Sequence, residues 1–440
     1  MLRFNENNEV ISKEMHSAIL VAVQTSDDIT YSMEELSGLA EAADVEVLGL
    51  LIQNLEKPNK ATYIGKGKVV ELAEMCVNME ADTVIFNNEL SGIQLRNLEE
   101  QLDVRVIDRT ILILDIFASR AVSGEGKLQV ELAQLQYRLP RLIGFGKSLS
   151  RLGGGIGTRG PGEKKLEIDR RHIAKRMDDI KAEILKLRSS RSTQRAKREK
   201  SEIPIVALVG YTNSGKSAMM NKLLEMTNGG EKVVFEEDML FATLDTSQRR
   251  IKLENNLEFI LIDTVGFVSK LPHSLVSAFK STLEEVNYAD LLLHIVDASY
   301  ENYDFHIEVT EQVMKEIGAG DKEKLLVFNK IDLLEDLSGV EQAEPCVIGA
   351  PQESINVSAK TGYGIEELLE QIKIKIFGDR VVVTLLIPYD RGDISSYLCE
   401  KAEVYSSEYL ENGTLMNVCI SNGDYGRLKK YEMEAAGGAI

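Results

Sequence analysis

The sequence predicts an α/β protein in four parts: an N-terminal α/β subdomain with a parallel sheet, an antiparallel helical hairpin, a second α/β domain and a small C-terminal α+β domain. Two observations predict this class. Short apolar runs alternate with helix-period segments in two separate stretches, and between these stretches the apolar spacing becomes that of paired helices. The length of 440 residues allows about three domains of ~150 residues each.

Composition narrows the class further. A hydrophobic content of 44% suffices for buried cores, and 28% charged residues suit a soluble surface. The four cysteines (Cys76, Cys346, Cys399 and Cys419) form no CxxC pair, which argues against a disulfide framework or a zinc site, and the five dispersed histidines are expected to be structural. No apolar run reaches the ~18 residues of a membrane span, and the polar start shows no signal peptide. We therefore expect a cytoplasmic protein. We also expect it to be a monomer that associates peripherally with large macromolecular assemblies or with a membrane surface.

The N-terminal subdomain, expected over 1–122, alternates strands with helices. Strands are predicted over 18–23, 45–52, 82–86 and 104–108, and helices over 32–43, 67–79, 93–102 and 110–121. Such a βα repeat favours a mostly parallel sheet, because the helix between two strands carries the chain back and the next strand then runs in the same direction as the last.

A helical hairpin is expected over 123–200. Its first apolar stripe consists of Leu128, Leu132, Leu135, Leu139 and Leu142, and its second of Leu166, Ile173, Met177, Ile180, Ile184 and Leu187. The alternating spacing of four and three predicts two helices with a shared seam, joined by a loop of about twenty residues. The end of the segment, 188–202, reads as a basic linker or a frayed helix end.

The loop of this hairpin, "LSRLGGGIGTRGPGE", contains Gly155-x-Gly157-x-x-Gly160, the spacing of a dinucleotide-binding turn. That turn requires a strand before it and a helix after it, and here both flanks are helical. Residues 138–200 also carry 19 Lys and Arg against seven Asp and Glu in a chain of net charge −19. A solvated charged face would explain this, and so would an RNA-contacting tip with Arg151, Arg159, Lys164 and Lys165 as candidate contacts.

The second α/β domain, expected over 201–377, opens with "IPIVALVGYTNSGKSAMMNKLL", an apolar strand, a glycine turn and a helix. Within it Gly210-x4-Gly215-Lys216-Ser217 fits the phosphate loop, in which backbone amides wrap phosphates, the lysine bridges them and the serine binds Mg²⁺. The required strand–turn–helix context is present.

Three further motifs follow in order at predicted strand ends. Asp263-x-x-Gly266 is expected to hold magnesium through water and to sense the γ-phosphate. In Asn329-Lys330-x-Asp332, the aspartate can accept both N–H donors of a guanine edge, and in Ser358-Ala359-Lys360 an amide can meet the guanine oxygen. Together they predict a P-loop GTPase domain whose nucleotide-binding residues are Gly210, Tyr211, Thr212, Asn213, Ser214, Gly215, Lys216, Ser217, Asp263, Gly266, Asn329, Lys330, Asp332, Ser358, Ala359 and Lys360.

Two positions leave alternatives open. Thr243, in a segment placed like a first switch, is the second candidate ligand of Mg²⁺ beside Ser217, with Thr246 and Ser247 as nearby substitutes. Phe267 stands where many GTPases carry the glutamine that orients the attacking water, so no catalytic residue is assigned. Either a partner rearranges the site or another group positions the water, and of these we favour activation by a partner. A phenylalanine that only packs in the core is the alternative, because switch segments often turn aromatic side chains inward. The remaining residues, 378–440, form the predicted α+β domain.

The chain resembles the HflX family of ribosome-associated GTPases nearly from end to end. The resemblance rests on "TYIGKGKVVEL", "RVIDRTILILDIFASRA", "EGKLQVELAQLQYRLPRLIG", "SRLGGGIGTRGPGE" with "LEIDRRHI", "GYTNSGKS", "FATLD" and "DTVGF". It implies binding of GTP and GDP with Mg²⁺, hydrolysis stimulated by the large ribosomal subunit, and splitting of stalled or idle ribosomes under heat or antibiotic stress. Departures are Ala218 where threonine is usual, a first switch without the usual Pro-Thr, and the more basic Lys164-Lys165 pair.

Two other functions compete with this one. The protein could be an RNA-binding or ribosome-assembly scaffold that GTP orders with little turnover. The N-terminal subdomain could also be an unrelated small-molecule enzyme, although it shows no paired catalytic carboxylates, no nucleophile–base set and no metal cluster.

Overall fold

The computed structural model describes residues 3–4, 10–11, 16–25, 29–141, 161–199, 203–228, 247–253, 257–269, 284–334, 354–378 and 380–433. The chain divides into two compact units. Unit 1 comprises 1–195, 237–245 and 267–282, and unit 2 comprises 196–236, 246–266 and 283–440. The predicted α/β class is confirmed, whereas the division into four domains at 122, 200 and 377 stays a prediction.

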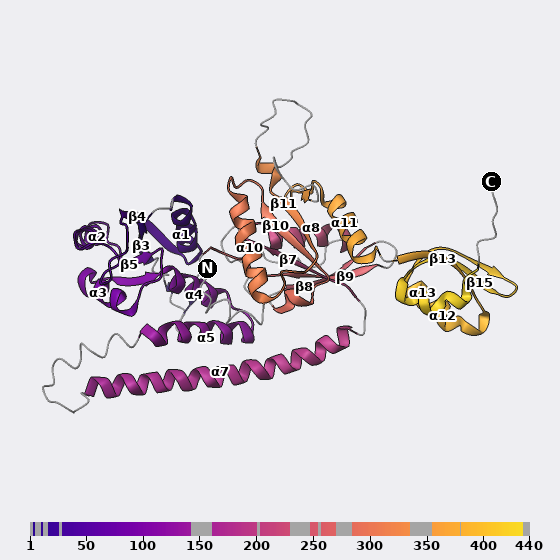
Figure 1. The fold of residues 1–440 in the computed structure, drawn as a ribbon, viewed down its shortest axis with the longest axis horizontal. Helices are drawn as coiled ribbons and strands as arrows, with labels where there is room; N and C mark the ends of the chain where they lie inside the picture. Colours follow the sequence, from indigo (N-terminus) through magenta and orange to yellow (C-terminus); the bar gives the residue numbers. More distant parts are fainter. Residues whose placement is uncertain are drawn as a thin grey trace, which may run out of the picture. The chain divides into compact units, whose positions relative to one another are not determined.

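Unit 1 is built on a four-stranded parallel sheet of order β4-β3-β5-β6. Its strands are β3 (His16–Gln24), β4 (Val45–Asn54), β5 (Thr83–Phe86) and β6 (Arg105–Asp108), and its helices are α1 (Thr30–Ala42), α2 (Lys66–Asn78), α3 (Gly92–Leu102) and α4 (Arg109–Arg120). Residues of α2 and α3 join sheet residues in one buried aliphatic cluster, and α1 and α4 contact each other and the sheet (Figure 1). A short antiparallel pair, β1 (Arg3–Phe4) and β2 (Val10–Ile11), precedes them. The predicted strands and helices of this region are thus present.

Two helices form the predicted hairpin of unit 1. α5 (Gly124–Arg141) and α7 (Pro161–Glu199) run antiparallel (Figure 1). Leu132, Ile180 and Ile184 form the centre of their seam, with Leu128, Leu135 and Met177 packed around it. Arg176 pairs with Glu131 across the helices, with Nε–Oε1 and Nη2–Oε2 distances of 2.7 and 2.8 Å. The segment 188–199 is helical, which favours the helix end over the linker, and residues 200–202 lie outside the described residues.

Unit 2 contains a six-stranded sheet of order β12-β11-β10-β7-β9-β8. Its strands are β7 (Ile205–Gly210), β8 (Ser247–Lys252), β9 (Glu258–Asp263), β10 (Leu291–Asp297), β11 (Lys324–Asn329) and β12 (Ser354–Asn356), and its helices are α8 (Lys216–Asn228), α10 (Tyr303–Ile317) and α11 (Ile365–Phe377). Only the β8–β9 pair among the described strands of this sheet is antiparallel. The carboxyl ends of the parallel strands therefore meet at one edge, where ligands of such sheets bind.

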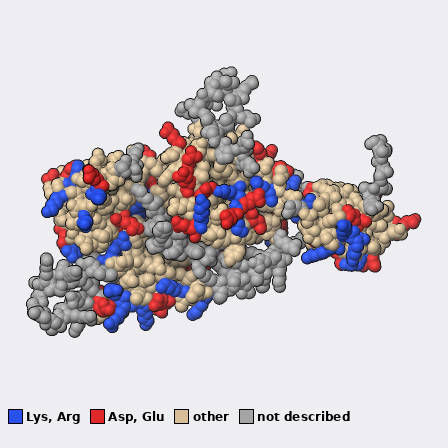
Figure 2. Space-filling model, viewed as in Figure 1, with Lys and Arg blue, Asp and Glu red and all other residues tan. Residues whose placement is uncertain are grey.

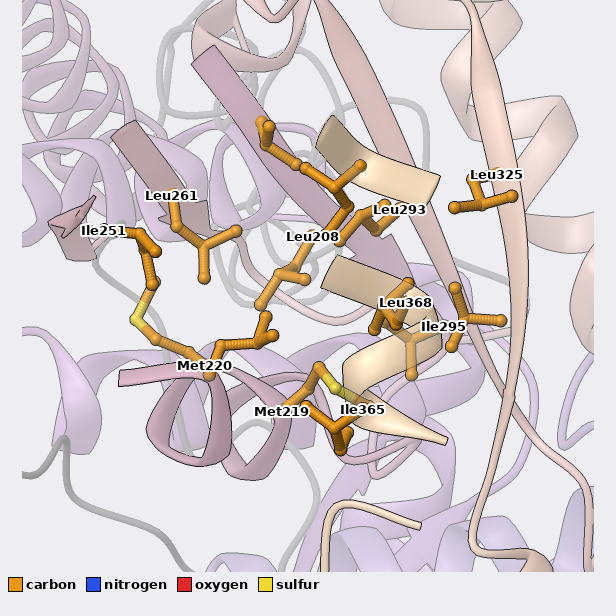
Figure 3. Packing of buried hydrophobic residues seen from close by; sticks show 14 of the residues in the cluster. Leu208, Met219, Met220, Ile251, Leu261, Leu293, Ile295, Leu325, Ile365 and Leu368 are labelled. Atoms are coloured by element: carbon orange, nitrogen blue, oxygen red, sulfur yellow. The ribbon is translucent and has the colours of Figure 1, made fainter. Parts of the chain in front are cut away.

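The core of this sheet lies between its strands and two helices. Met219 and Met220 of α8 and Ile365 and Leu368 of α11 pack with Leu208, Leu293 and Ile295 of the strands (Figure 3). α10 packs on Val296 and Phe328 through Tyr303 and Ile307, in a separate buried cluster. Packing on both faces holds the strand ends, and the loops that follow them, in fixed positions.

The C-terminal part of unit 2 has its own antiparallel sheet of order β13-β15-β14. The strands are β13 (Arg380–Ile387), β14 (Glu403–Leu410) and β15 (Gly413–Ser421), and the helices are α12 (Gly392–Lys401) and α13 (Asn422–Leu428). Leu385, Met416 and Val418 face Leu398 and Leu428 in a separate core. The predicted α+β pattern is present.

Charge is mixed over the described surface. In the view of Figure 2, blue and red side chains lie interspersed on both units, and the described part of α7 shows both signs. No helix among the described residues is long and apolar enough to cross a bilayer.

His294 is the one polar side chain in the middle of β10, and it is 1% exposed. Burial, reinforced by the charge of Lys324, lowers its pKa from 6.5 to about 4, although Glu311 acts in the opposite direction. Between these two pH values the unfolded chain takes up a proton that the folded chain refuses. Folding stability contributed by the neutral imidazole is therefore complete above pH 6.5 and is lost as the pH falls towards 4.

We predict that the free energy of unfolding decreases between pH 6.5 and pH 4 by about 3 kcal/mol more in the unaltered protein than in His294→Leu. Urea unfolding at several pH values measures the difference. The control is His172→Leu, which alters an exposed histidine of α7 and should leave the slope unchanged. Equal pH slopes for the unaltered protein and His294→Leu would show that His294 is not held neutral.

Candidate functional site

The loop between β7 and α8 has a backbone that only glycine can follow at two positions. Gly210 has φ +153° and Gly215 has φ +89°. A Cβ at Gly210 would lie 2.2 Å from the Ile295 carbonyl oxygen, and one at Gly215 would lie 2.2 Å from Asn329 Nδ2. The loop therefore lies directly against β10 and β11, as a cradle of backbone amides requires.

Lys216 is the first residue of α8, and its ammonium is buried, with 6% of the residue exposed. It donates to the carbonyl oxygens of Gly210 (3.1 Å) and Tyr211 (2.6 Å), so it folds back over the loop. Burial lowers its pKa from 10.5 to about 8, with Asp263 opposing the shift and Lys330 adding to it. A cation desolvated to this degree is stabilised by an anion, and phosphate oxygens suit the position.

Ser217 and Asp263 come together beside the lysine. Ser217 Oγ donates to Asp263 Oδ2 at 2.7 Å, and Asp263 is fully buried at the end of β9. Hydroxyl and carboxylate oxygens are the ligands that Mg²⁺ prefers, and Mg²⁺ usually binds one or two protein groups together with substrate phosphates. The donor set therefore fits Mg²⁺. Thr243 lies outside the described residues, within which no cluster of three His, Cys, Asp or Glu side chains could hold a metal.

Gly266 lies against the phosphate loop. A Cβ there would lie 2.7 Å from Thr212 Cα and 3.0 Å from Lys216 Nζ. The neighbouring Thr264 is fully buried and donates from Oγ1 to the Leu208 carbonyl oxygen at 2.6 Å. The segment after β9 is thus fixed close to the lysine that the phosphates would meet.

Asn329 joins the loops at three strand ends. Its Nδ2 donates to the Ser214 carbonyl oxygen (2.9 Å), and its Oδ1 accepts from the Ala359 amide (3.0 Å). The residue is buried at the end of β11. The structure thereby places the phosphate loop, the Asn329–Asp332 turn and the Ser358–Lys360 segment in one site, as their positions at parallel strand ends predict.

The residues predicted to recognise the base are held by local contacts. Ser358 Oγ donates to Asp332 Oδ1 at 2.6 Å and accepts from the Thr361 amide at 3.1 Å. Lys330 adopts φ +64°, and its ammonium pairs with Asp297 at 2.9 Å, while Lys360 is exposed. Ser358, in the segment after β12, therefore fixes the position of one carboxylate oxygen of Asp332. The two motifs form one surface that the edge of a guanine base could meet.

Sequence reasoning missed two features of this site. Asp297, at the end of β10, orients Lys330, and its position at a strand end was the available signal. His306 of α10 stacks between Tyr211 and Tyr300, with ring centroids 3.9 and 4.5 Å away. The spacing of these three residues in the sequence does not indicate the stack. Because Tyr211 belongs to the phosphate loop, the stack stabilises that loop.

Phe267 and Ser269 follow Gly266 directly and belong to unit 1. Phe267 is 2% exposed, so its ring is buried, as the core-packing alternative requires. The Ser269 hydroxyl contacts both members of a buried ion pair, Glu35 of α1 and Arg109 of α4, and lies 3.2 Å from Arg109 Nη2. Arg109 also donates to Asn87 Oδ1 at 3.2 Å. This network, which sequence reasoning also missed, ties the chain after Gly266 to the helices of unit 1.

The predicted RNA contacts cannot be placed by side chain. Arg151 and Arg159, with the glycine-rich loop 142–160, lie outside the described residues. Lys164 and Lys165 lie in the first turns of α7, but only their backbone is described. Both flanks of the loop are helices, which is the context that argued against a dinucleotide turn.

Family models match the chain in four consecutive pieces. They are described as GTP-binding GTPase N-terminal (30–118), GTP-binding GTPase middle region (120–198), 50S ribosome-binding GTPase (205–330) and HflX C-terminal domain (348–430). The third spans the phosphate loop, Asp263, Gly266 and Asn329.

Curated relatives match over most of the chain. GTPase HflX of Caldanaerobacter subterraneus subsp. tengcongensis is 49% identical over 92% of this chain and 91% of the relative. GTPase HflX of Escherichia coli (strain K12) is 40% identical over 94% of this chain and 96% of the relative. Among solved structures, a crystal structure of SsGBP in complex with GDP is 26% identical, covers 81% of this chain and 97% of that chain, and has a TM-score of 0.44.

We predict that Gly266→Ala weakens binding of GDP and of a non-hydrolysable GTP analogue at least ~10-fold, about 1.4 kcal/mol, because the new methyl group must displace the Thr212 backbone or the Lys216 ammonium. Equilibrium titration with fluorescent nucleotides measures the affinity. Gly392→Ala is the matched control, since a Cβ at Gly392 meets nothing within 4 Å. Unchanged affinity in Gly266→Ala would contradict the proximity of this glycine to the bound phosphates.

Proposed function

This chain belongs to the HflX family of GTPases, and on that premise we propose that it binds the large ribosomal subunit and uses GTP binding and hydrolysis to split stalled or idle ribosomes under heat or antibiotic stress. Its enzymatic reaction is hydrolysis of GTP to GDP and phosphate. The finding that carries the ribosomal part is the match of residues 205–330 to a model described as a 50S ribosome-binding GTPase.

Within the cradle, each described residue has a role in the proposed reaction. Lys216 would exchange its two carbonyl partners for β- and γ-phosphate oxygens, and the amides of the phosphate loop would donate to the same groups. Ser217 and Asp263 would hold Mg²⁺, which when bound neutralises charge that builds up on the phosphates. Asp332 and the Ala359 amide would recognise guanine, with Asn329 fixing their spacing from the phosphate loop.

Regulation by the ribosome is proposed from the residue after Gly266. A buried phenylalanine cannot orient the attacking water, so Phe267 does not fill that role. We therefore expect slow hydrolysis by the isolated protein. Contact with the large subunit would supply or uncover the group that positions the water.

The helical hairpin is proposed as the RNA-contacting element. Residues 138–200 carry the positive excess of an otherwise acidic chain, and the helices α5 and α7 flank the glycine-rich segment in the sequence. Backbone amides and guanidinium groups in such a segment suit irregular RNA shape and phosphate rather than a base sequence.

We predict that purified large ribosomal subunits raise the GTP hydrolysis rate at least ~10-fold, because completing the water-positioning group lowers the barrier by 1.4 kcal/mol or more. Phosphate release at increasing subunit concentration measures the rate. Small subunits at equal concentration control for nonspecific RNA. A flat rate with large subunits would contradict ribosomal activation and would favour the scaffold alternative.

The role of the hairpin is tested by measuring cosedimentation with large subunits and, separately, the affinity for GDP. Arg151→Glu with Arg159→Glu should weaken binding of the large subunit about 10-fold or more while leaving GDP affinity intact, since two phosphate contacts would be lost and reversed. Arg170→Glu with Arg171→Glu makes the same charge change elsewhere on the basic segment and serves as the control. Equal loss in both double variants would indicate general electrostatics instead of a contact at the tip.

A further inference from the structure

A cavity of about 390 Å³ lies in unit 1, away from the phosphate loop in the sequence and in a part of the fold to which no role has been given above. Residues of α3, β6, α4 and α5 line it. At roughly 30 Å³ per water molecule it has room for about a dozen waters, and its volume falls within the ~300–1,000 Å³ of small-molecule sites.

The wall of this cavity is mainly aliphatic. Leu95, Val106, Ile107, Ile111 and Leu114 contribute apolar surface from three different elements. Leu114 and Val106 are almost completely buried, whereas Arg105 and Arg138 are exposed and Asp115 is partly exposed, so the apolar wall lies at the inner end of a pocket that opens to the surface. A ligand that fills it must bring an apolar body.

Three guanidinium groups and two carboxyl groups also line the cavity, and two of the three arginines have ion-pair partners within the protein. Arg105 pairs with Asp115 at 3.1 Å. Arg141 lies 3.5 Å from Asp108, donates to the Leu90 carbonyl oxygen at 3.1 Å and stacks over the Tyr137 ring. These two arginines are therefore occupied by the protein itself.

One cation and one carboxyl group are left over. Arg138 of α5 is exposed and makes no ion pair within the described part of the chain, although its charge acts on the Asp115 carboxyl group. Glu99 of α3 is half-buried and meets the Val106 amide and the more distant charge of Arg105, and burial raises the pKa of its carboxyl group. A buried carboxylate of this kind is stabilised by a cationic partner.

We propose that this cavity binds an apolar α-amino acid in its zwitterionic form, with the carboxylate on Arg138, the ammonium on Glu99 and the side chain against the aliphatic wall. A purely anionic ligand would leave Glu99 without a cationic partner, and a purely cationic one would leave Arg138 without an anionic partner. The zwitterion matches both free charges and the apolar wall at once. This site is independent of the nucleotide cycle proposed above.

The test is isothermal titration of the full-length protein, loaded with GDP, with leucine, isoleucine, valine, methionine and phenylalanine up to about 10 mM, which detects affinities in the millimolar range. N-acetyl-leucine lacks the ammonium group, and leucinamide lacks the carboxylate. Each should bind about 10- to 100-fold more weakly than leucine, the loss expected for one hydrogen bond to a charged group.

Two variants locate the binding. Arg138→Gln should weaken leucine binding by the same factor and abolish the preference for leucine over leucinamide, and Glu99→Gln should abolish the preference over N-acetyl-leucine. Glu99→Gln keeps the size of a half-buried side chain and Arg138→Gln shortens an exposed one, so folding is preserved, and the unfolding temperature checks this. Glu100→Gln and Lys127→Gln, on the same two helices outside the cavity, are the matched controls.

Three results would overturn the proposal. The first is the absence of saturable binding for all five amino acids. The second is equal affinity for leucine and N-acetyl-leucine, which would leave only an anion site. The third is binding that Arg138→Gln and Glu99→Gln do not change, which would place the amino acid elsewhere on the protein.

Discussion

The buried ammonium of Lys216 is the constraint on which the nucleotide site depends. The ammonium is shielded from solvent, and two backbone carbonyl oxygens are its hydrogen-bond acceptors. Those carbonyls can approach only because Gly210 and Gly215 turn the chain as no other residue could, and Gly266 leaves room beside the ammonium. A cationic cradle with amides on one side and Ser217 and Asp263 on the other is suited to one kind of occupant, the phosphates of a nucleotide with its metal.

Parallel strand order brings the predicted base-recognition motifs to the same site. Because β7, β9, β11 and β12 end at the same edge, motifs that lie far apart in the sequence reach one ligand. Asn329 makes the connection rigid by bonding to the phosphate loop and to the Ala359 amide. In unit 1 the chain that follows Gly266 is held by the Glu35–Arg109 pair through Ser269. Thr264 within unit 2 and Ser269 within unit 1 thus each fix the chain on their own side of Gly266.

Much of this could be predicted from the sequence because the relevant signals are local. Strand alternation, the glycine turn before Lys216 and the polar residues after apolar strands can each be recognised within a short stretch of the sequence. Contacts between distant residues could not be predicted. The Tyr211–His306–Tyr300 stack, the Asp297–Lys330 pair and the Glu35–Arg109–Ser269 network depend on which faces the helices present, and single-sequence spacing does not encode that. The cavity beside Arg138 and Glu99 is likewise a product of packing among four elements.

The central claim is that the nucleotide state of this cradle controls the association of ribosomal subunits. Sucrose-gradient sedimentation of intact ribosomes with the full-length protein, in GDP or in a non-hydrolysable GTP analogue, tests it most directly. With the analogue, intact ribosomes should move into separate subunit peaks and the protein should sediment with the large subunit, whereas with GDP the ribosomes should stay intact. Identical profiles in the two nucleotides would contradict the account.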